Sequence, residues 1–288
     1  MLPHATRLGQ ATSGIARVVE AYFKHLPAFG IELVDNDAET YDLKAVHAGM
    51  TGSDCDICHS HGMYWTADYD APDWEYRTNA KVIQASRSAK EVTVPSSWVA
   101  ETYQRDMHLS PTVIPHGIDW HEWQGVTDRS YYILWNKNRQ ADVCDVSPAI
   151  ALARLFPDTP FVSTFAPDDA PSNVHATDVV PHEKMKRIVQ KAGVYLSTTK
   201  ETWGIGILEA MASGVPIVGY AHGGILDLVE HGVNGYLAEP NNLEDLERGL
   251  HYCQDHNRTL GQNGRIMAHD WTWEKACEKV AEVYKRAL

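Results

Sequence analysis

Two glutamates, Glu201 and Glu209, lie on either side of a glycine-containing turn in the stretch KETWGIGILEAMASG at 200–214. Gly204 and Gly206 stand between them, and the small apolar residues that follow predict a closely packed helix. Glycines let the backbone approach a ligand, and the first N–H groups of a helix attract an anion. The two carboxylates can accept hydrogen bonds from hydroxyl groups. Phosphate at the helix start with hydroxyls on either side describes a nucleotide sugar.

The same spacing also has a structural interpretation. Acidic residues near a helix N-terminus are favoured simply because they complement the helix dipole. The spacing of Glu201 and Glu209 alone is equally compatible with that structural role.

The elements around this stretch predict a parallel sheet covered on both faces. Apolar strands without alternation, each followed by an amphipathic helix, are typical of doubly wound α/β domains. In such sheets, ligands bind beyond the carboxyl ends of the strands, where the 199–206 loop must lie. The predicted strands are 112–115, 131–135, 160–165, 194–198, 215–220 and 235–238. The predicted helices are 147–156, 182–192, 206–213, 224–231 and 242–254, followed by a C-terminal helix pair.

The first part of the chain shows a less regular alternation. We predict a helix at 13–30, opened by Ser13 and ended by Gly30, and a second helix at 96–106. Short strands are predicted at 31–34, 81–86 and 91–96. The fold class is therefore α/β, with two Rossmann-like doubly wound domains and a cleft expected between them. The predicted domains are 1–112 and 113–272, with a C-terminal helix at 273–288 that crosses back to the first domain.

The composition of the chain limits the classes of function that it can have. The formal net charge of −13 opposes binding to nucleic acid or to an anionic membrane. The chain has no apolar run long enough to span a bilayer and no apolar core of a signal peptide near its start. Five cysteines without regular spacing suit reduced thiols. We therefore expect a cytoplasmic protein.

The stretch from 200 to 246 closely resembles the donor-binding core of the family-four retaining glycosyltransferases, which have the GT-B fold. It carries their pair of glutamates separated by seven residues and most of the pattern around that pair, with Trp203 where phenylalanine is more usual. The resemblance runs from about Thr112 to the end of the chain. TVIPHGIDWHEW at 112–123 resembles the family's inter-domain segment, with His116 replacing asparagine.

The resemblance implies roles for the glycine turn and its carboxylates. Glu209 would hold the ribose hydroxyls, and Glu201 would contact the transferred sugar and steady the developing positive charge. Backbone amides near Gly204, Ile205 and Gly206 would face the donor phosphates.

Other donor contacts are implied by weaker matches. The family grips the diphosphate with an arginine and a lysine, whereas YYILWNKNRQADVCD at 131–145 offers Lys137 or Arg139, and the choice between them stays open. TDVVPHEKM at 177–185 resembles the segment that reads the nucleobase, so Val180 and Pro181 would line that slot.

Two segments of the first part resemble family motifs as well. TSGIARVV at 12–19 resembles the glycine loop that approaches the donor phosphates, which implies Gly14 and Arg17. DICHSHGMYW at 56–65 resembles a segment with a histidine near the transferred sugar, which implies His61. A structural role for this histidine is equally compatible with the sequence.

The expected reaction is transfer of a sugar from a UDP or GDP sugar to a carbohydrate or glycoconjugate hydroxyl, with retention and without a metal or other cofactor. Zinc binding by CDICHSH at 55–61 is disfavoured, because ligands so close in sequence leave little chain to surround an ion. The alternatives are a non-catalytic nucleotide-sugar-binding protein and a transferase acting on modified nucleic-acid bases.

Overall fold

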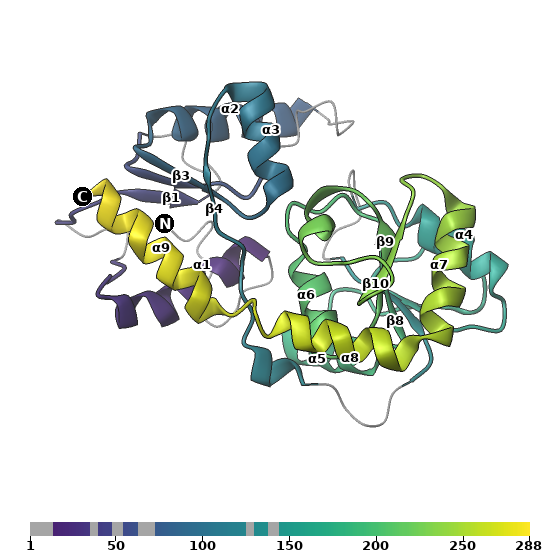
Figure 1. The fold of residues 1–288 in the computed structure, drawn as a ribbon. Helices are drawn as coiled ribbons and strands as arrows, with labels where there is room; N and C mark the ends of the chain where they lie inside the picture. The colour runs from purple at the N-terminus through teal and green to yellow at the C-terminus, as the bar shows by residue number, and fades with distance from the viewer. Residues whose placement is uncertain (1–13, 35–39, 48–53, 63–72, 125–129, 138–143) are drawn as a thin grey trace. The chain divides into compact units, whose positions relative to one another are not determined.

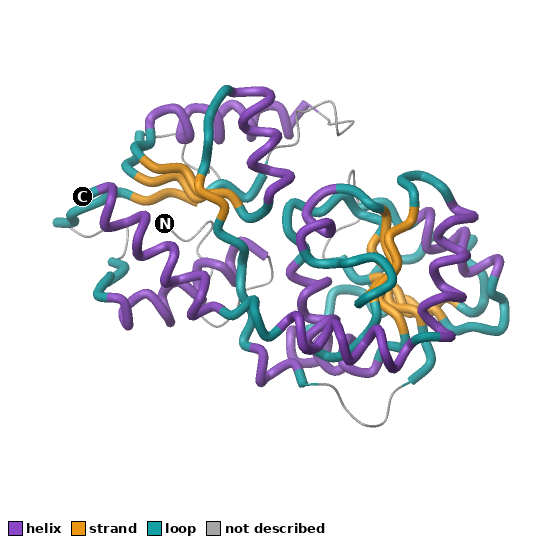
Figure 2. Tube along the Cα trace, in the orientation of Figure 1, coloured by secondary structure: helices purple, strands orange, loops and turns teal. Residues whose placement is uncertain are grey.

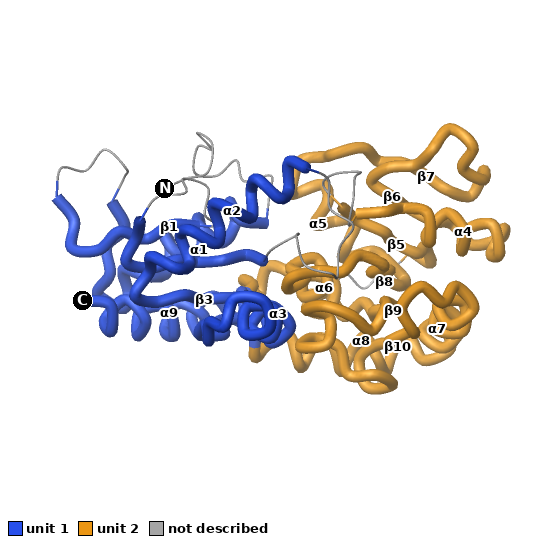
Figure 3. Tube along the Cα trace, turned by 90° about the horizontal axis from the view of Figure 1, so that it is seen from above, with its two compact units in different colours: residues 1–117, 271–288 blue, residues 118–270 orange. Residues whose placement is uncertain are grey.

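The chain folds into two compact α/β units, shown in different colours in Figure 3. The computed structural model describes residues 14–34, 40–47, 54–62, 73–124, 130–137 and 144–288. Unit 1 comprises residues 1–117 and 271–288, and unit 2 comprises residues 118–270. The units therefore divide after residues 117 and 270, a few residues from the predicted boundaries after 112 and 272.

Unit 1 contains a parallel sheet in the order β1-β2-β3-β4. Its strands are β1 (Ala45–His47), β2 (Ile57–His59), β3 (Glu91–Val94) and β4 (Thr112–Val113). Figure 1 shows helices α2 (Asp73–Ser88) and α3 (Ser97–Met107) on one side of this sheet. On the other side lie α1 (Gly14–His25), followed by the 3-10 turn η1 (Leu26–Phe29), and the C-terminal helix α9 (Trp273–Ala287).

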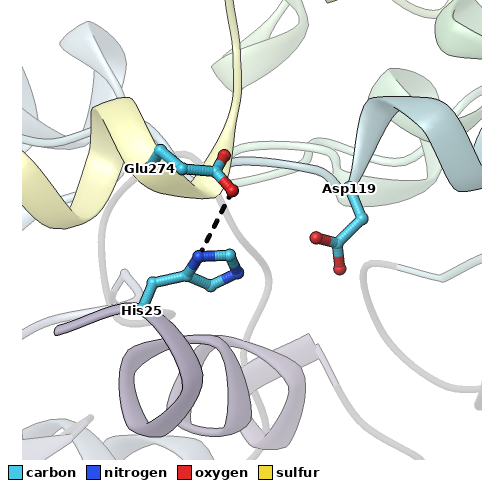
Figure 4. Close-up of side chains that lie close together, drawn as sticks. All are labelled: His25, Asp119 and Glu274. Carbon is cyan, nitrogen blue, oxygen red and sulfur yellow. Dashed lines mark ion pairs between the residues drawn. The ribbon is translucent and has the colours of Figure 1, made fainter. Parts of the chain in front are cut away.

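Local signals explain where these helices begin and end. The Ser96 hydroxyl accepts a hydrogen bond from the Val99 amide and caps α3. Gly30 has φ +80°, a left-handed conformation that ends η1. An ion pair of 3.3 Å joins His25 of α1 to Glu274 of α9 (Figure 4, which also draws Asp119 of unit 2). The C-terminal helix is thereby tied to the N-terminal one within unit 1.

Unit 2 contains a six-stranded parallel sheet in the order β10-β9-β8-β5-β6-β7. Its strands are β5 (Ile133–Trp135), β6 (Phe161–Ser163), β7 (Val174–Ala176), β8 (Val194–Ser197), β9 (Ile217–Tyr220) and β10 (Gly235–Ala238). From the middle, β5, β6 and β7 follow one another in one direction, and β8, β9 and β10 follow in the other. This is the doubly wound order, and its direction reverses between β5 and β8.

Helices cover both faces of the unit 2 sheet, as Figures 1 and 2 show. On one face, α4 (Ser147–Leu155) packs beside α7 (Leu243–Asp255). On the other, α6 (Ile205–Ala212) packs between α5 (His182–Lys191) and α8 (Asn257–Ala268). Strand residues such as Ile133 and Leu196 are nearly fully buried. Burial on both faces explains why these strands read as continuous apolar runs.

Several sequence predictions for individual elements are wrong. Residues 31–34 form no strand, and residues 81–86 belong to helix α2 instead of a strand. The helix predicted at 224–231 is a short 3-10 turn, η3 (Gly223–Asp227). A further 3-10 turn, η2 (Trp120–Trp123), and strands β1, β2 and β7 were not predicted. Within the described residues, no helix is long and apolar enough to cross a membrane.

Candidate functional site

The candidate site lies at the carboxyl ends of β5 and β8, where the strand order of unit 2 reverses. A crevice opens at this position in doubly wound sheets, because the chains leaving the two neighbouring strands turn to opposite faces. Lys137 follows β5, and Glu201 follows β8. The two charged residues are 64 positions apart in sequence, yet the fold brings their side chains into contact.

Lys137 and Glu201 form an ion pair in which the ammonium group donates to Glu201 Oε1. The Lys137 side chain is only 7% exposed, while that of Glu201 is 26% exposed. Burial by itself lowers the pKa of Lys137, but the Glu201 carboxylate and Tyr195 outweigh burial and raise this pKa above its usual value. Lys137 is therefore a fixed positive charge at neutral pH.

Polar contacts between neighbouring strands hold the Lys137 turn in place. The Lys137 backbone N–H donates to Thr164 Oγ1 at 3.1 Å, and Thr164 Oγ1 donates to Asn136 Oδ1 at 3.3 Å. The indole N–H of Trp135, the last residue of β5, donates to Thr198 Oγ1 at 3.1 Å. These bonds tie the end of β5 to the ends of β6 and β8.

The glycine turn predicted from the sequence forms the start of helix α6. Gly204 is the N-cap residue with φ +104°, a conformation that strains any residue with a Cβ, and no side chain caps the helix. The N–H groups of the first turn have no acceptor within the helix itself, so they can bind an anion. At Gly206, a Cβ would lie 2.5 Å from the Tyr195 hydroxyl oxygen, so this position has no room for a side chain.

Glu209 lies one turn into α6 and is 4% exposed. Tyr195 of β8 lies within electrostatic reach of Glu209, Glu201 and Lys137. Burial raises the pKa of Tyr195 to about 12, with Lys137 opposing the shift and both glutamates adding to it. The structure thus gathers the two glutamates and Lys137 around one tyrosine hydroxyl.

Tyr195 was missed as a site residue in the sequence analysis, although a signal for it exists. Its strand was predicted as fully buried, and a buried tyrosine needs a partner for its hydroxyl group. That hydroxyl points to the backbone carbonyl of Asn136, at 3.5 Å. The polar end of Tyr195 therefore lies beside the turn that carries Lys137.

Two further glycines hold the loop that carries Glu201. The Gly224 N–H donates to the Glu201 carbonyl at 2.7 Å. A Cβ at Gly223 would lie 2.5 Å from the Glu201 carbonyl oxygen, and a Cβ at Gly224 would lie 2.6 Å from Trp203 Cα. The backbone of η3 packs directly on the Glu201 loop, which explains the Gly-Gly pair that follows β9.

The other residues predicted to bind the donor belong to other segments or lie outside the described residues. Val180 and Pro181 follow β7, and Pro181 is the N-cap of α5. Val180 is half-buried and Pro181 is exposed. Arg139 lies outside the described residues, so Lys137 is the described one of the two alternative diphosphate-binding residues.

The predicted residues of the first part all belong to unit 1. Gly14 begins α1 and is exposed, and Arg17 is half-buried in the same helix. His61 Nε2 lies 3.2 Å from His47 Nδ1, and burial lowers the pKa of His61 to about 4. His61 is therefore neutral at pH 7.

The CDICHSH segment does not gather its cysteines and histidines around one point. The imidazole nitrogens of His59 already contact Thr93 Oγ1 at 2.7 Å and the Tyr284 hydroxyl at 3.1 Å. Cys55 and Cys58 turn their thiols toward helix α2. Among the described residues, this segment contributes to no group of three potential ligands able to hold a metal ion.

Comparison with known proteins matches residues 169–267 to the family model of the glycosyl transferases group 1. An uncharacterized glycosyltransferase of Methanocaldococcus jannaschii is 34% identical over 88 residues, which are 30% of this chain and 25% of that protein. Sucrose synthase of Thermosynechococcus vestitus is 30% identical over 107 residues, or 34% of this chain and 13% of that protein. These matches span a quarter or less of the relatives' own length.

Solved structures share the fold over most of the chain. HepE of Anabaena, solved with UDP-glucose, superposes with a TM-score of 0.68 and 19% identity over 80% of this chain and 72% of its own. A glycosyltransferase of Rickettsia africae has a TM-score of 0.68 and 14% identity over 96% of both chains. Residues 169–267 are therefore similar to the glycosyl transferases group 1 family, and the chain has the α/β fold of the GT-B glycosyltransferases, with two Rossmann-like units.

Proposed function

We propose that this chain transfers a sugar from a nucleoside-diphosphate sugar to an acceptor hydroxyl. The observation that carries the proposal is the Lys137–Glu201 ion pair at the point where the strand order reverses, next to the uncapped start of α6. A buried cation, helix N–H groups and carboxylates suit three of the four chemical parts of such a donor, namely the diphosphate, the ribose and the sugar.

The charges suggest how the donor enters. The diphosphate competes with Glu201 for the Lys137 ammonium and takes further hydrogen bonds from the amides near Gly204, Ile205 and Gly206. Glu209 accepts hydrogen bonds from the ribose hydroxyls. Glu201, released from Lys137, turns to the sugar hydroxyls and stabilises positive charge at the reacting carbon.

The same site supports a retaining, metal-independent reaction as part of the proposal. Lys137 and the helix N-terminus supply positive charge for the leaving diphosphate, so the reaction needs no metal ion for that purpose. With the acceptor on the same face of the sugar, the departing phosphate can take the acceptor proton. Arg139 remains a candidate for a second cationic contact, and Val180 and Pro181 for the nucleobase contact.

UDP sugars are the first donors to test, because the related fold of HepE was solved with UDP-glucose. The proposed acceptor is a carbohydrate or glycoconjugate, since the net charge of −13 opposes binding to nucleic acid. A cytoplasmic location is part of the same proposal, because all five cysteines are free.

Calorimetric titration with UDP, UDP-glucose and a GDP sugar tests the proposal, followed by an assay for release of the nucleoside diphosphate. Binding together with donor turnover supports a transferase. Binding without turnover, in the presence of a panel of sugar acceptors, favours a non-catalytic binding protein. Absence of binding to every sugar nucleotide contradicts the proposal, and a DNA band shift that weakens steeply with salt favours a base-modifying transferase.

A further inference from the structure

Cys55 and Cys58 lie three positions apart, and both turn their thiols toward helix α2, although only Cys58 belongs to strand β2. The N–H groups of both Asp56 and Ile57 donate to the Lys44 carbonyl, at 2.8 and 3.1 Å. Asp56 lies at a bend immediately before β2, whose regular pairing with β1 begins at Ile57. In a regular strand, residues three apart point to opposite faces, but Cys55 precedes the strand, and its thiol contacts the same helix as that of Cys58.

Both thiols lie over a single turn of helix α2. The Cys55 thiol donates to the Ala85 carbonyl at 3.5 Å, and Cys58 Sγ lies 3.6 Å from the hydroxyl oxygen of the next residue, Ser86. Cys55, Cys58 and Ala85 also share one buried apolar cluster with Val46. The helix contacts and the hydrogen bond between the two thiols place the two sulfur atoms side by side.

The two thiols differ in exposure and in pKa, as the two thiols of a reactive pair do. Cys55 precedes strand β2 and is 8% exposed, whereas Cys58 is fully buried within it. A hydrogen bond from Cys58 lowers the pKa of the Cys55 thiol, and the same interaction together with burial raises the pKa of Cys58. The outer thiol forms the thiolate more readily, and the inner thiol stays protonated until the outer one has reacted.

We propose that Cys55 and Cys58 form a redox pair that closes to an intrachain disulfide. The oxidant is a low-molecular-weight disulfide such as oxidised glutathione. The Cys55 thiolate attacks one sulfur of the oxidant, forms a mixed disulfide and releases one thiolate. Cys58 then loses its proton, attacks the Cys55 sulfur and expels the second thiolate. Two protein thiols lose two electrons and two protons, and the oxidant leaves as two thiols.

A chain of hydrogen bonds connects this pair to the segment that carries His61. Cys58 Sγ contacts Ser86 Oγ, Ser86 Oγ lies 3.2 Å from the Tyr103 hydroxyl, and that hydroxyl donates to Ser60 Oγ at 2.5 Å. Ser60 Oγ in turn accepts from the Gly62 N–H at 3.3 Å, next to His61. Gly62 has φ +116°. Disulfide closure removes the Cys58 thiol proton and moves its sulfur away from Ser86, so the first link of this chain is lost.

Oxidation is therefore expected to displace the His61 segment while leaving unit 2 unchanged. This consequence rests on the proposed function, because it assumes that His61 serves the transfer reaction. Turnover should fall by about tenfold or more, since small displacements of positioning groups have effects of that size. Binding of UDP should stay within about twofold, because the proposed donor groups Lys137, Glu201 and Glu209 are in unit 2.

The disulfide itself is tested without any activity assay. The full-length chain is reduced, equilibrated with oxidised glutathione, blocked with N-ethylmaleimide and digested with trypsin. Peptide 45–77, which Lys44 and Arg77 delimit, contains both cysteines and no other. We expect this peptide to be two hydrogen atoms lighter and free of maleimide, while the protein still melts cooperatively. A peptide that keeps two maleimide groups, or that stops at a glutathione adduct, overturns the proposal.

Substitutions of single cysteines separate the role of Cys55 from that of Cys58. Cys58→Ser should trap glutathione on Cys55, and Cys55→Ser should leave Cys58 unmodified in the folded protein. Cys277→Ser, a buried cysteine on α9 of the same unit, is the matched control and should leave the disulfide in peptide 45–77 unchanged. A disulfide that forms only in urea contradicts the proposal. If the disulfide forms but no sugar nucleotide binds, the redox pair stands and the proposed function fails.

Discussion

The ammonium group of Lys137 and the carboxylate of Glu201 meet at the point where the strand order of the unit 2 sheet reverses. The pair neutralises the position at which an anionic ligand would bind. An anion that enters there must compete with Glu201, and in doing so it frees a carboxylate for its own hydroxyl groups. In the proposed reaction, the ion pair therefore couples binding of the donor phosphates to positioning of Glu201.

Replacing Lys137 with methionine should lower the affinity for UDP by about 10- to 100-fold, because a charge-assisted hydrogen bond to phosphate is lost. The variant should also lose about 1 to 3 kcal/mol of unfolding free energy, since Glu201 keeps its charge without its partner and is only partly solvated. Calorimetry and urea unfolding measure the two effects.

Arg154→Met is the matched control for Lys137→Met. Arg154 pairs with Asp169 at 2.9 Å on the surface of the same unit, with both side chains exposed. A pair of this kind contributes little, so we expect a change in unfolding free energy below about 1 kcal/mol and unchanged UDP affinity. Equal effects of the two substitutions would rule out a special role for Lys137.

The two glutamates should separate donor binding from turnover. Glu209→Ala removes the proposed acceptor for the ribose hydroxyls and should weaken UDP binding by about tenfold or more. Glu201→Gln should leave UDP affinity unchanged or raise it, because the diphosphate no longer competes with a carboxylate for Lys137. The same substitution should lower turnover of the sugar donor by about 100-fold.

Calorimetry with UDP and a coupled assay for nucleoside-diphosphate release measure both glutamate variants. Glu244→Gln, in the first turn of α7, serves as a control in the same unit and should match the wild type. Weaker UDP binding in Glu201→Gln than in Glu209→Ala would reverse the proposed roles.

Much of unit 2 was predictable from sequence because its strands are buried on both faces and its helices are amphipathic. Residues 235–238, for example, form the predicted strand. Unit 1 was harder, because β1 and β2 have three residues each and both end in histidine, so they lack the apolar run of a buried strand. Residues 81–86 read as a strand because Val82 and Ile83 favour β structure, yet the whole segment belongs to one 16-residue helix.

The candidate site was only partly accessible from sequence for a different reason. Glu201, Glu209 and the glycine turn form one continuous motif, so their proximity could be predicted. The contact between Lys137 and Glu201 depends on the pairing of β5 with β8, which sequence patterns do not specify. Tyr195 escaped notice because its position is explained equally well by core packing.

Gly224→Ala tests how the Glu201 loop is supported. The new Cβ would lie 2.6 Å from Trp203 Cα and 2.7 Å from the Thr202 carbonyl oxygen, and both are backbone atoms that cannot move independently. We expect a loss of about 1 to 3 kcal/mol in unfolding free energy, and lower donor turnover from displacement of Glu201.

Gly264→Ala provides the steric control in the same unit. Its Cβ would meet neighbouring atoms at 3.7 Å, which is ordinary contact distance, and the residue lies inside helix α8. Alanine favours a helix over glycine, so this variant should be equal in stability or gain up to about 1 kcal/mol. Urea unfolding of the two variants side by side checks the difference. A neutral Gly224→Ala would show that the loop does not depend on this close contact.

The histidines of unit 1 should make the protein sensitive to acid. His47, His59, His61 and His116 form a row of neighbouring rings with centroids 4.8 to 5.5 Å apart. Burial lowers the pKa of His59 to about 3 and that of His61 to about 4, and it holds the pKa values of His47 and His116 well below their usual value. All four residues are therefore neutral in the folded protein at pH 7.

The unfolded chain takes up protons at these histidines below about pH 6.5, whereas the folded chain does so only at clearly lower pH, near pH 4 for His61 and near pH 3 for His59. The unfolding free energy is therefore unaffected by these histidines above about pH 6.5, and it decreases as the pH falls from there toward 4. Each histidine contributes a slope of up to about 1.4 kcal/mol per pH unit in that window. His116→Phe, which also removes a buried Nδ1 that has no hydrogen-bond partner among the described residues, should flatten the slope by about that amount. Urea unfolding between pH 7.5 and 5 measures the slope, with the exposed His175→Gln as control. Identical slopes in wild type and His116→Phe would mean that His116 gains its proton equally in both states.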